Sequence, residues 1–250
     1  MCGIIGYVGD RDALPILSTG LANLEYRGYD SAGVALAGDD LSVLKKSGEV
    51  SALQSILPDA SDSQQGIGHT RWSTHGPPTD ENAHPHTDCS GRVAVVHNGI
   101  IENYDALRKE LSDHTFVSDT DTEVIPHLIE AELDGGAEPR AAVEAALERL
   151  DGTYALVVAI AGVDELYATR QDSPLVIGHG DTGTFIGSDV TAFLEHTRDV
   201  TYLDDGDFAV VSDEGVEIHR DGNPIEPSVE TLTYEADAAE KGGYDHYMLK

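Results

Sequence analysis

The sequence predicts an α+β fold in which helices lie outside layered sheets. Three observations favour this class. Apolar stretches with the short length of strands dominate both ends of the 250-residue chain, and helical patterns gather in its middle. Hydrophobic residues make up 40% of the chain and occur in periodic runs, so a packed core is expected despite the high charge. The length suits one large domain or two small ones.

The first hundred residues are expected to form strands around a single helix. Leucines recur at helical spacing, which predicts a helix over residues 13–24. A Gly-Asp-Asp turn predicts a hairpin. The strands expected in this part cover residues 2–8, 33–37, 41–45, 66–70 and 93–97. Residues 72–89 contain three prolines and predict a long loop, a kind of segment that is usually functional or disordered.

Helices and further strands are expected in the rest of the chain. The predicted helices cover residues 104–111, 122–133 and 140–150, with one more near 190–196. Thr120 or Asp121 is the expected cap of the second helix, and Pro139 suits the first turn of the third. Residues 154–160 predict an apolar strand that is buried on both faces. Shorter strands are expected as far as about residue 218.

One domain over residues 1–230 is the expected organisation. No internal repeat is visible in the sequence. After about residue 230 the apolar pattern breaks into polar and small residues. Residues 231–250 therefore predict a linker.

The excess of acidic over basic residues argues against some classes of binding partner. The chain has 46 acidic and 15 basic residues, a formal net charge of -31 and a pI of about 4.3. Such a surface repels phosphate backbones and anionic lipids, so neither nucleic acid nor a membrane surface is an expected partner. The acidity is dispersed along the chain, which favours a salt-loving source, because screening at high ionic strength removes most of the self-repulsion. The alternative is an ordinary acidic cytoplasmic protein.

Membrane insertion and secretion are also not expected. The longest apolar run, residues 154–163, has about half of the roughly 20 residues that a spanning helix needs. The N-terminus lacks the basic and apolar regions of a signal peptide. Two cysteines cannot form a disulfide framework, so a reduced, cytoplasmic protein is predicted.

Cys2 is the sharpest chemical feature of the sequence. Methionine before a small residue is normally trimmed, which would leave this cysteine as the first residue. A terminal cysteine carries a thiol nucleophile beside an α-amine whose pKa is near 8, and that amine can act as a general base. The alternative is that Cys2 only begins a buried strand.

Four further segments carry polar and glycine-rich motifs at strand or helix ends, and together with the first segment they resemble one family. The five segments are Cys2-Gly3-Ile4-Ile5-Gly6, residues 25–33 (EYRGYDSAG), residues 69–76 (HTRWSTHG), residues 97–103 (HNGIIEN) and residues 118–123 (SDTDTE). In this order they resemble the glutaminase domain of the class II glutamine amidotransferases, which are N-terminal-nucleophile hydrolases. The second and third segments are most similar to the glutamine–fructose-6-phosphate aminotransferase branch. The similarity continues to the tail at residues 244–250, which resembles that branch's connection to a sugar-isomerase half.

This resemblance implies a four-layer αββα sandwich and a set of roles. Cys2 matches the nucleophile, and Asn98 and Gly99 match the oxyanion hole. Arg71 matches the residue that binds the substrate α-carboxylate, and Asp121 the partner of its α-ammonium. The other implied residues are Trp72, Thr74 and His75, which would contact the substrate from a loop, and Arg27 and Gly28, which would support the nucleophile.

Each assignment has a simpler alternative. Arg71 can be a surface ion-pair residue, Asp121 only a helix cap, and Asn98-Gly99 an ordinary tight turn. His84-Pro85-His86 and Cys89 resemble a metal cluster by composition, but a zinc site usually needs a second ligand pair at defined spacing. No metal and no cofactor are therefore expected.

The predicted function is hydrolysis of L-glutamine to glutamate and ammonia. The resemblance implies that a full-length, homo-oligomeric enzyme passes the ammonia to fructose 6-phosphate and yields glucosamine 6-phosphate, the first step of hexosamine biosynthesis. The sugar-isomerase half is expected to be absent from these 250 residues. Two alternatives stay open: the glutaminase of another amidotransferase, and an amino-acid-binding module without turnover. Whether Met1 is removed distinguishes the enzyme from the amino-acid-binding module, because a retained methionine leaves no free amine on Cys2.

Overall fold

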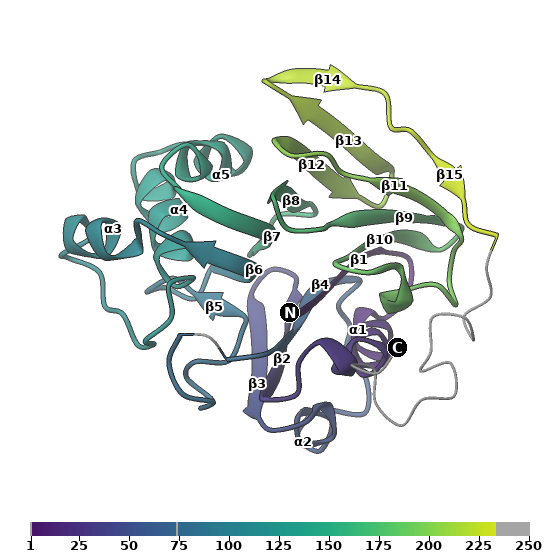
Figure 1. Cartoon of the computed structure of the whole chain (residues 1–250), viewed down its shortest axis with the longest axis horizontal. Helices are drawn as coiled ribbons and strands as arrows, with labels where there is room; N and C mark the ends of the chain where they lie inside the picture. Colours follow the sequence, from purple (N-terminus) through teal and green to yellow (C-terminus); the bar gives the residue numbers. More distant parts are fainter. Residues whose placement is uncertain (1, 74, 234–250) are drawn as a thin grey trace.

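Two antiparallel sheets lie face to face and carry helices on their outer sides (Figure 1). The computed structural model describes residues 2–73 and 75–233. Within these residues the first sheet has eight strands and the second has seven.

The first sheet follows the strand order β15-β11-β9-β10-β1-β4-β2-β3. Its strands are β1 (Gly3–Gly9), β2 (Ser31–Ala37), β3 (Leu41–Ser47), β4 (Gln65–Arg71), β9 (Val176–Gly180), β10 (Gly183–Gly187), β11 (Asp199–Tyr202) and β15 (Glu230–Thr231). The predicted hairpin is confirmed, because β2 pairs with β3 across the expected turn. Central β1 pairs with β4 on one side and β10 on the other, so the residue before β1 lies beside the end of β4.

The second sheet follows the order β14-β13-β12-β8-β7-β6-β5. Its strands are β5 (His86–Thr87), β6 (Val93–Ile101), β7 (Gly152–Ile160), β8 (Leu166–Gln171), β12 (Asp207–Ser212), β13 (Gly215–Arg220) and β14 (Asn223–Ile225). As predicted, β7 is apolar and buried on both faces over its last six residues.

Helices cover the outer face of each sheet. The first sheet carries α1 (Ala13–Asn23) and α2 (Val50–Gln54), with the short 3-10 turns η1 (Glu25–Arg27) and η2 (Val190–Ala192) beside them. The second carries α3 (Tyr104–Glu110), α4 (Val124–Asp134) and α5 (Pro139–Leu147). Helix α1 begins at the Asp12 cap, whose carboxylate accepts a hydrogen bond from the Leu14 amide at 3.0 Å. Its predicted leucine face is buried.

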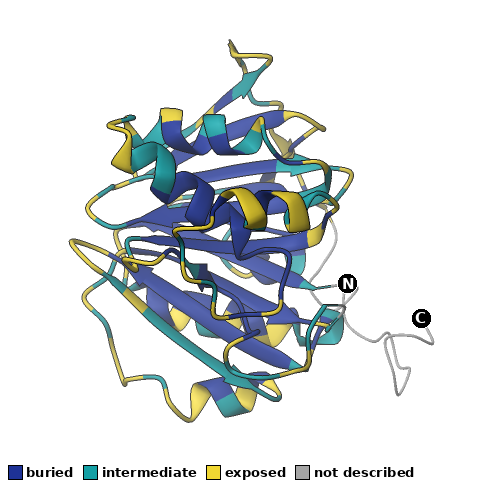
Figure 2. Cartoon of the chain, turned by 90° about the vertical axis from the view of Figure 1, so that its left-hand side faces the viewer, coloured by how far each residue is buried: buried dark blue, intermediate teal, exposed yellow. Residues whose placement is uncertain are grey.

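Three apolar clusters hold these layers together. One lies between α1 and the first sheet, one between the two sheets, and one between the second sheet and α4 with α5. Side chains alternate along each strand, so Ile5 packs toward α1 whereas Ile4 packs between the sheets. Figure 2 shows that the buried residues follow the strands and that exposed residues lie on the outer helices and loops. The predicted αββα sandwich is confirmed.

Two expected details of the helices are wrong. Helix α4 begins at Val124 after Glu123, and Asp121 does not cap it, because the Asp121 carboxylate accepts the Ile101 amide of β6 instead. The helix expected near residues 190–196 is only the turn η2. It stops because Phe193 leaves helical geometry, with φ of -141°, and buries its ring in the cluster beneath α1.

The packed part of the chain passes the expected domain boundary at residue 230. Strand β15 pairs with β11, and Leu232 is buried in the same cluster as α1. The first two residues of the expected linker, 231 and 232, therefore belong to the packed fold, and residues 234–250 of it lie outside the described residues. In the described residues no helix has the length and apolar character needed to span a membrane.

Candidate active site

The predicted catalytic residues come from both sheets and meet at one small cavity. Cys2 precedes β1, Arg71 ends β4, Gly99 lies in β6, and Asp121 precedes α4. A cavity of about 30 Å³ is lined by Cys2, Arg71, Trp72, His75, Gly99 and Asp121 together with neighbouring histidines and threonines. Thr74, another predicted contact, lies outside the described residues. The structure thus brings together segments separated by up to about 120 residues of sequence.

The Cys2 thiol lies against the backbone of Trp72. The Trp72 amide donates to Sγ at 3.2 Å, and Sγ lies 3.6 Å from the Trp72 carbonyl oxygen. Burial raises the pKa of the Cys2 thiol, and the hydrogen bond from the Trp72 amide offsets only part of this effect. The thiol is therefore mainly protonated at neutral pH and needs a base before it can attack.

A buried histidine determines which way the Asn98 amide points. His69 Nε2 lies 3.0 Å from Asn98 Oδ1 and 3.1 Å from the His97 carbonyl oxygen. Both partners are acceptors, so Nε2 must carry the proton and donate. Burial lowers the pKa of His69 to about 3, which keeps the ring neutral. With its oxygen held by His69, Asn98 directs Nδ2 to the Cys2 carbonyl oxygen at 3.0 Å.

Sequence reasoning assigned no role to His69. A signal was present, because His69 lies two residues after Ile67, which packs between the sheets, and β4 alternates its faces. A histidine on that face must find a polar partner in the opposite sheet, and it finds one in Asn98 of β6.

Gly99 occupies a backbone position that only glycine suits. Its φ is +140°, and an added Cβ would lie 1.9 Å from the Thr153 carbonyl oxygen of β7. The peptide after Asn98 therefore turns in a way that a side chain would prevent.

Arg71 is buried and held by the loop that follows β4. Its guanidinium donates to the carbonyl oxygens of His75, Gly76 and Pro77, the last two at 3.3 Å. Arg71 is therefore a buried cation at the cavity, and the surface ion-pair alternative is wrong for it. The next residue, Trp72, has an exposed fraction of 42% and packs edge-on against Tyr29, with ring centroids 5.4 Å apart.

The predicted supporting turn packs directly beneath Arg71. An added Cβ on Gly28 would lie 2.6 Å from the Arg71 carbonyl carbon, so the two backbones touch. Arg27 forms an ion pair with Asp189 at 2.7 Å, and Tyr26 donates to the same carboxylate at 2.8 Å. This half-buried carboxylate ties the turn to the segment after β10.

Four buried histidines, here called the histidine wall, lie at or behind the cavity, which His84 and His97 line directly. They are His69, His84, His86 and His97, and burial lowers the pKa of each. The rings of His69 and His84 lie 4.1 Å apart, and those of His84 and His86 lie 4.6 Å apart. His84-Pro85-His86 is therefore directed into the protein, whereas Cys89 is exposed. The two halves of the composition-based metal motif do not meet.

The αββα sandwich and a cysteine at the start of its central strand define the N-terminal-nucleophile hydrolase class, and comparisons with known proteins agree. The phosphoribosylpyrophosphate amidotransferase of B. subtilis has a similar structure, with a TM-score of 0.76 and 26% identity over 88% of this chain and 49% of that one. Residues 69–195 match the family described as the glutamine amidotransferase domain. The chain belongs to this family.

Similar sequences extend the comparison over the whole chain. The glutamine–fructose-6-phosphate aminotransferase of Halobacterium salinarum is 59% identical over 100% of this chain and 42% of its own length. Those of Symbiobacterium thermophilum and Thermococcus kodakarensis are 52% and 48% identical, also over 100% of this chain. The chain spans less than half the length of these relatives.

Proposed function

We propose that this chain hydrolyses the side-chain amide of L-glutamine, with the Cys2 thiol as the nucleophile. The observation that carries the proposal is the meeting of a thiol, a buried cation and a carboxylate around one cavity, with the oriented Asn98 amide hydrogen-bonded to Cys2 beside it. An α-amino acid presents the complementary charges. Arg71 suits the α-carboxylate because its planar guanidinium can donate two parallel hydrogen bonds. Asp121 uses one oxygen for the Ile101 amide and keeps the other for the α-ammonium.

Glutamine binding then requires the loop after β4 to release Arg71. The cavity of about 30 Å³ is far smaller than a ligand site, which usually has about 300–1,000 Å³. Three loop carbonyl oxygens hold the guanidinium that the substrate needs. A substrate carboxylate replaces these acceptors, and Trp72 and His75, which line the cavity, can then cover the bound amino acid. Substrate binding and loop position are therefore coupled.

The chemical steps follow from the groups at Cys2. After Met1 is removed, the Cys2 amine takes the thiol proton, directly or through a water, and sulfur bonds to the amide carbon. Asn98 Nδ2 and the Gly99 amide stabilise the oxyanion, and such donors typically contribute about 3–4 kcal/mol each. The amine returns the proton to the leaving nitrogen as the carbon–nitrogen bond breaks and ammonia departs. Water then cleaves the thioester through a second oxyanion and releases glutamate.

The names of the relatives suggest where the ammonia goes. We propose that the complete protein transfers it to fructose 6-phosphate, in a sugar-isomerase part outside these residues, and works as a homo-oligomer. The runner-up is a glutaminase serving another acceptor, and the high identity to the aminotransferases favours the first. A reducing, cytoplasmic setting fits this chemistry, because Cys2 must stay a free thiol.

Replacement of the nucleophile tests this proposal. Cys2→Ala should abolish glutamate release from glutamine, whereas Ser42→Ala, a change of similar size at an exposed position of β3, should leave it unchanged. Intact-mass measurement of both proteins reports whether Met1 is removed. Comparable turnover in Cys2→Ala, or turnover by protein that keeps Met1, would sink the mechanism.

A further inference from the structure

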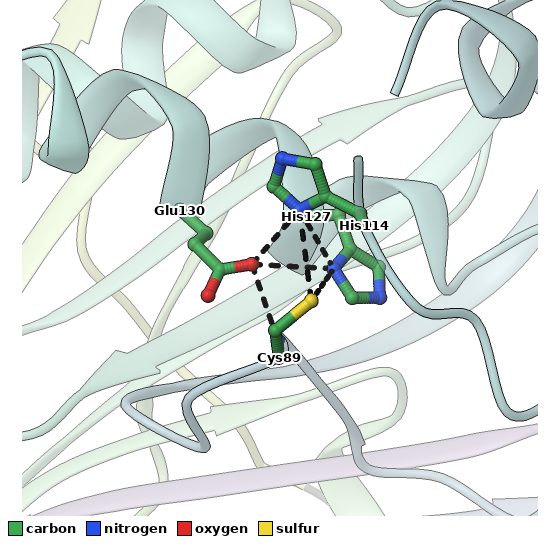
Figure 3. Close-up of side chains that lie close together, drawn as sticks. All are labelled: Cys89, His114, His127 and Glu130. Carbon is green, nitrogen blue, oxygen red and sulfur yellow. Dashed lines mark hydrogen bonds and ion pairs between the residues drawn. The ribbon is translucent and has the colours of Figure 1, made fainter. Parts of the chain in front are cut away.

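We propose that Cys89, His114, His127 and Glu130 bind one divalent transition-metal ion of the zinc type. The four side chains come from three segments that meet beside the start of α4 (Figure 3). Cys89 follows β5, and His114 lies in the connection between α3 and α4. His127 and Glu130 are three residues apart on α4, which places them on one helix face. None of the four lines the cavity at Cys2.

The donor atoms already have nearly the spacing of a metal coordination shell. A tetrahedral zinc ion with ordinary bond lengths holds sulfur and nitrogen about 3.6 Å apart, and nitrogen and oxygen about 3.3 Å apart. Cys89 Sγ lies 3.6 Å from His127 Nδ1 and 3.8 Å from His114 Nδ1. Glu130 Oε2 lies 2.9 Å from His114 Nδ1 and 3.4 Å from His127 Nδ1. The two Nδ1 atoms are 3.2 Å apart, and all four donor atoms lie within 4.8 Å of one another.

Contacts outside the four donor atoms orient two of the ligands, Glu130 by hydrogen bonds and His127 by a nearby carboxylate. The amides of Cys89 and Ser90 donate to the two Glu130 carboxylate oxygens at 3.1 Å and 3.2 Å, which fixes that side chain. His127 Nε2 lies 3.8 Å from Glu123 Oε1, so the ring's other nitrogen faces a carboxylate. A histidine that binds metal through one nitrogen commonly directs its other N–H to such a group.

The residue types of the four ligands indicate which metal ions the site would bind. One thiolate and two imidazoles favour zinc and neighbouring transition metals over Mg²⁺ and Ca²⁺, which prefer all-oxygen shells. His127 and Glu130 are buried, whereas Cys89 is exposed, so an ion can enter from the solvent side. The four protein ligands fill a tetrahedral shell and leave no open position, as in structural zinc sites. A bound ion would fasten the α3–α4 connection, which also carries Asp121, to α4 and the loop after β5.

Cobalt substitution tests the site directly. Co²⁺ added to the Cys2→Ala chain should give visible bands of a tetrahedral ion and a thiolate-to-cobalt charge-transfer band at one equivalent. Only Cys89 can supply that thiolate, because the sequence has two cysteines. Cys89→Ser, an exposed change that should not disturb folding, should lose the charge-transfer band while keeping Cys2. The same band in Cys89→Ser, or none in Cys2→Ala, would overturn the proposal.

Zinc should also stabilise the fold through this site. At a free Zn²⁺ concentration about a hundredfold above Kd, Tm should rise by about 5–10 °C in the unsubstituted chain. His114→Ala, at the partly exposed ligand, should remove most of this rise, and Mg²⁺ should not produce it in either protein. An equal rise in both proteins with Zn²⁺ would show that the ion binds elsewhere, and no rise in the unsubstituted chain would show that it does not bind at all.

Discussion

At Arg71, the proposed binding of the substrate carboxylate and the observed hold on the neighbouring loop depend on the same guanidinium. It donates to the carbonyl oxygens of His75, Gly76 and Pro77, and a carboxylate of glutamine would take over these donors. Lysine keeps the charge but loses the planar fork. Arg71→Lys should therefore raise KM by about tenfold or more and change kcat only modestly. Steady-state glutaminase kinetics give both values, and an unchanged KM would contradict the assigned role.

His69 acts through Asn98, which makes a matched pair of variants informative. His69→Leu removes the donor that orients the Asn98 amide, so kcat should fall by about 10²-fold with little change in KM. His69→Gln can place an amide N–H near the position of Nε2 and should recover much of the activity.

A double variant separates positioning from general damage to the fold. If His69 works only by orienting Asn98, His69→Leu should cost little further activity in a protein that already carries Asn98→Ala. Additive losses in kcat would indicate that His69 has a structural role of its own. Circular dichroism of each variant checks that the fold is kept.

At the scale of the element, strand β6 depends on one glycine for its turn toward the cavity. Gly99→Ala should destabilise the protein by about 3 kcal/mol or more, because an alanine Cβ would overlap the Thr153 carbonyl oxygen of β7. Gly162→Ala is the matched control. Gly162 also has positive φ, at +71°, but an added Cβ there meets nothing within 4 Å.

Chemical denaturation of the two glycine variants measures this difference. The Gly162 variant should lose only about 1–2 kcal/mol, which is the cost of the left-handed backbone for alanine. Equal losses would mean that φ alone, and not the contact with β7, explains the need for glycine in β6.

For the molecule as a whole, the buried histidine wall predicts instability in mild acid. The folded state keeps these four rings neutral, with pKa values below those of the unfolded chain, as for His69 at about 3. Their contribution to stability is complete above the unfolded pKa of about 6.5 and is lost as pH falls below it. Each ring can add a slope of up to about 1.4 kcal/mol per pH unit.

Unfolding free energies measured across this pH window, in molar KCl, test the prediction. High salt screens the carboxylates, whose neutralisation would otherwise stabilise the acid-rich chain. His69→Gln should show a shallower slope than the unsubstituted protein, since one titrating ring is gone. An identical slope in both would contradict the neutral state assigned to His69.

The net charge predicts that salt itself stabilises the fold. With a net charge of -31, self-repulsion favours expanded states in dilute buffer, and the Debye length falls to about 3 Å at 1 M salt. Tm should therefore rise steadily from dilute buffer to molar KCl. A flat or falling Tm would argue against a salt-adapted protein and for an ordinary acidic one.

The sequence by itself determined the elements whose causes are local and the family to which the chain belongs. Helix α1 follows from leucines at helical spacing and strand β7 from an unbroken apolar run, because periodicity and burial act over a few residues. The candidate site residues were found from short motifs, and the fold gathers six of them, Cys2, Arg71, Trp72, His75, Gly99 and Asp121, at one cavity.

Only the tertiary structure decided which polar groups meet across the layers. Asp121 bonds to the Ile101 amide of β6 instead of capping α4, and His69 of one sheet orients Asn98 of the other. Cys89 meets His114, His127 and Glu130, and not His84 or His86, because the two histidines before and within β5 are buried, whereas the cysteine that follows β5 lies at the surface beside α4. These contacts join residues 20 to 41 positions apart, and no local pattern specifies such pairings. Chain topology and the alternation of strand faces determine them.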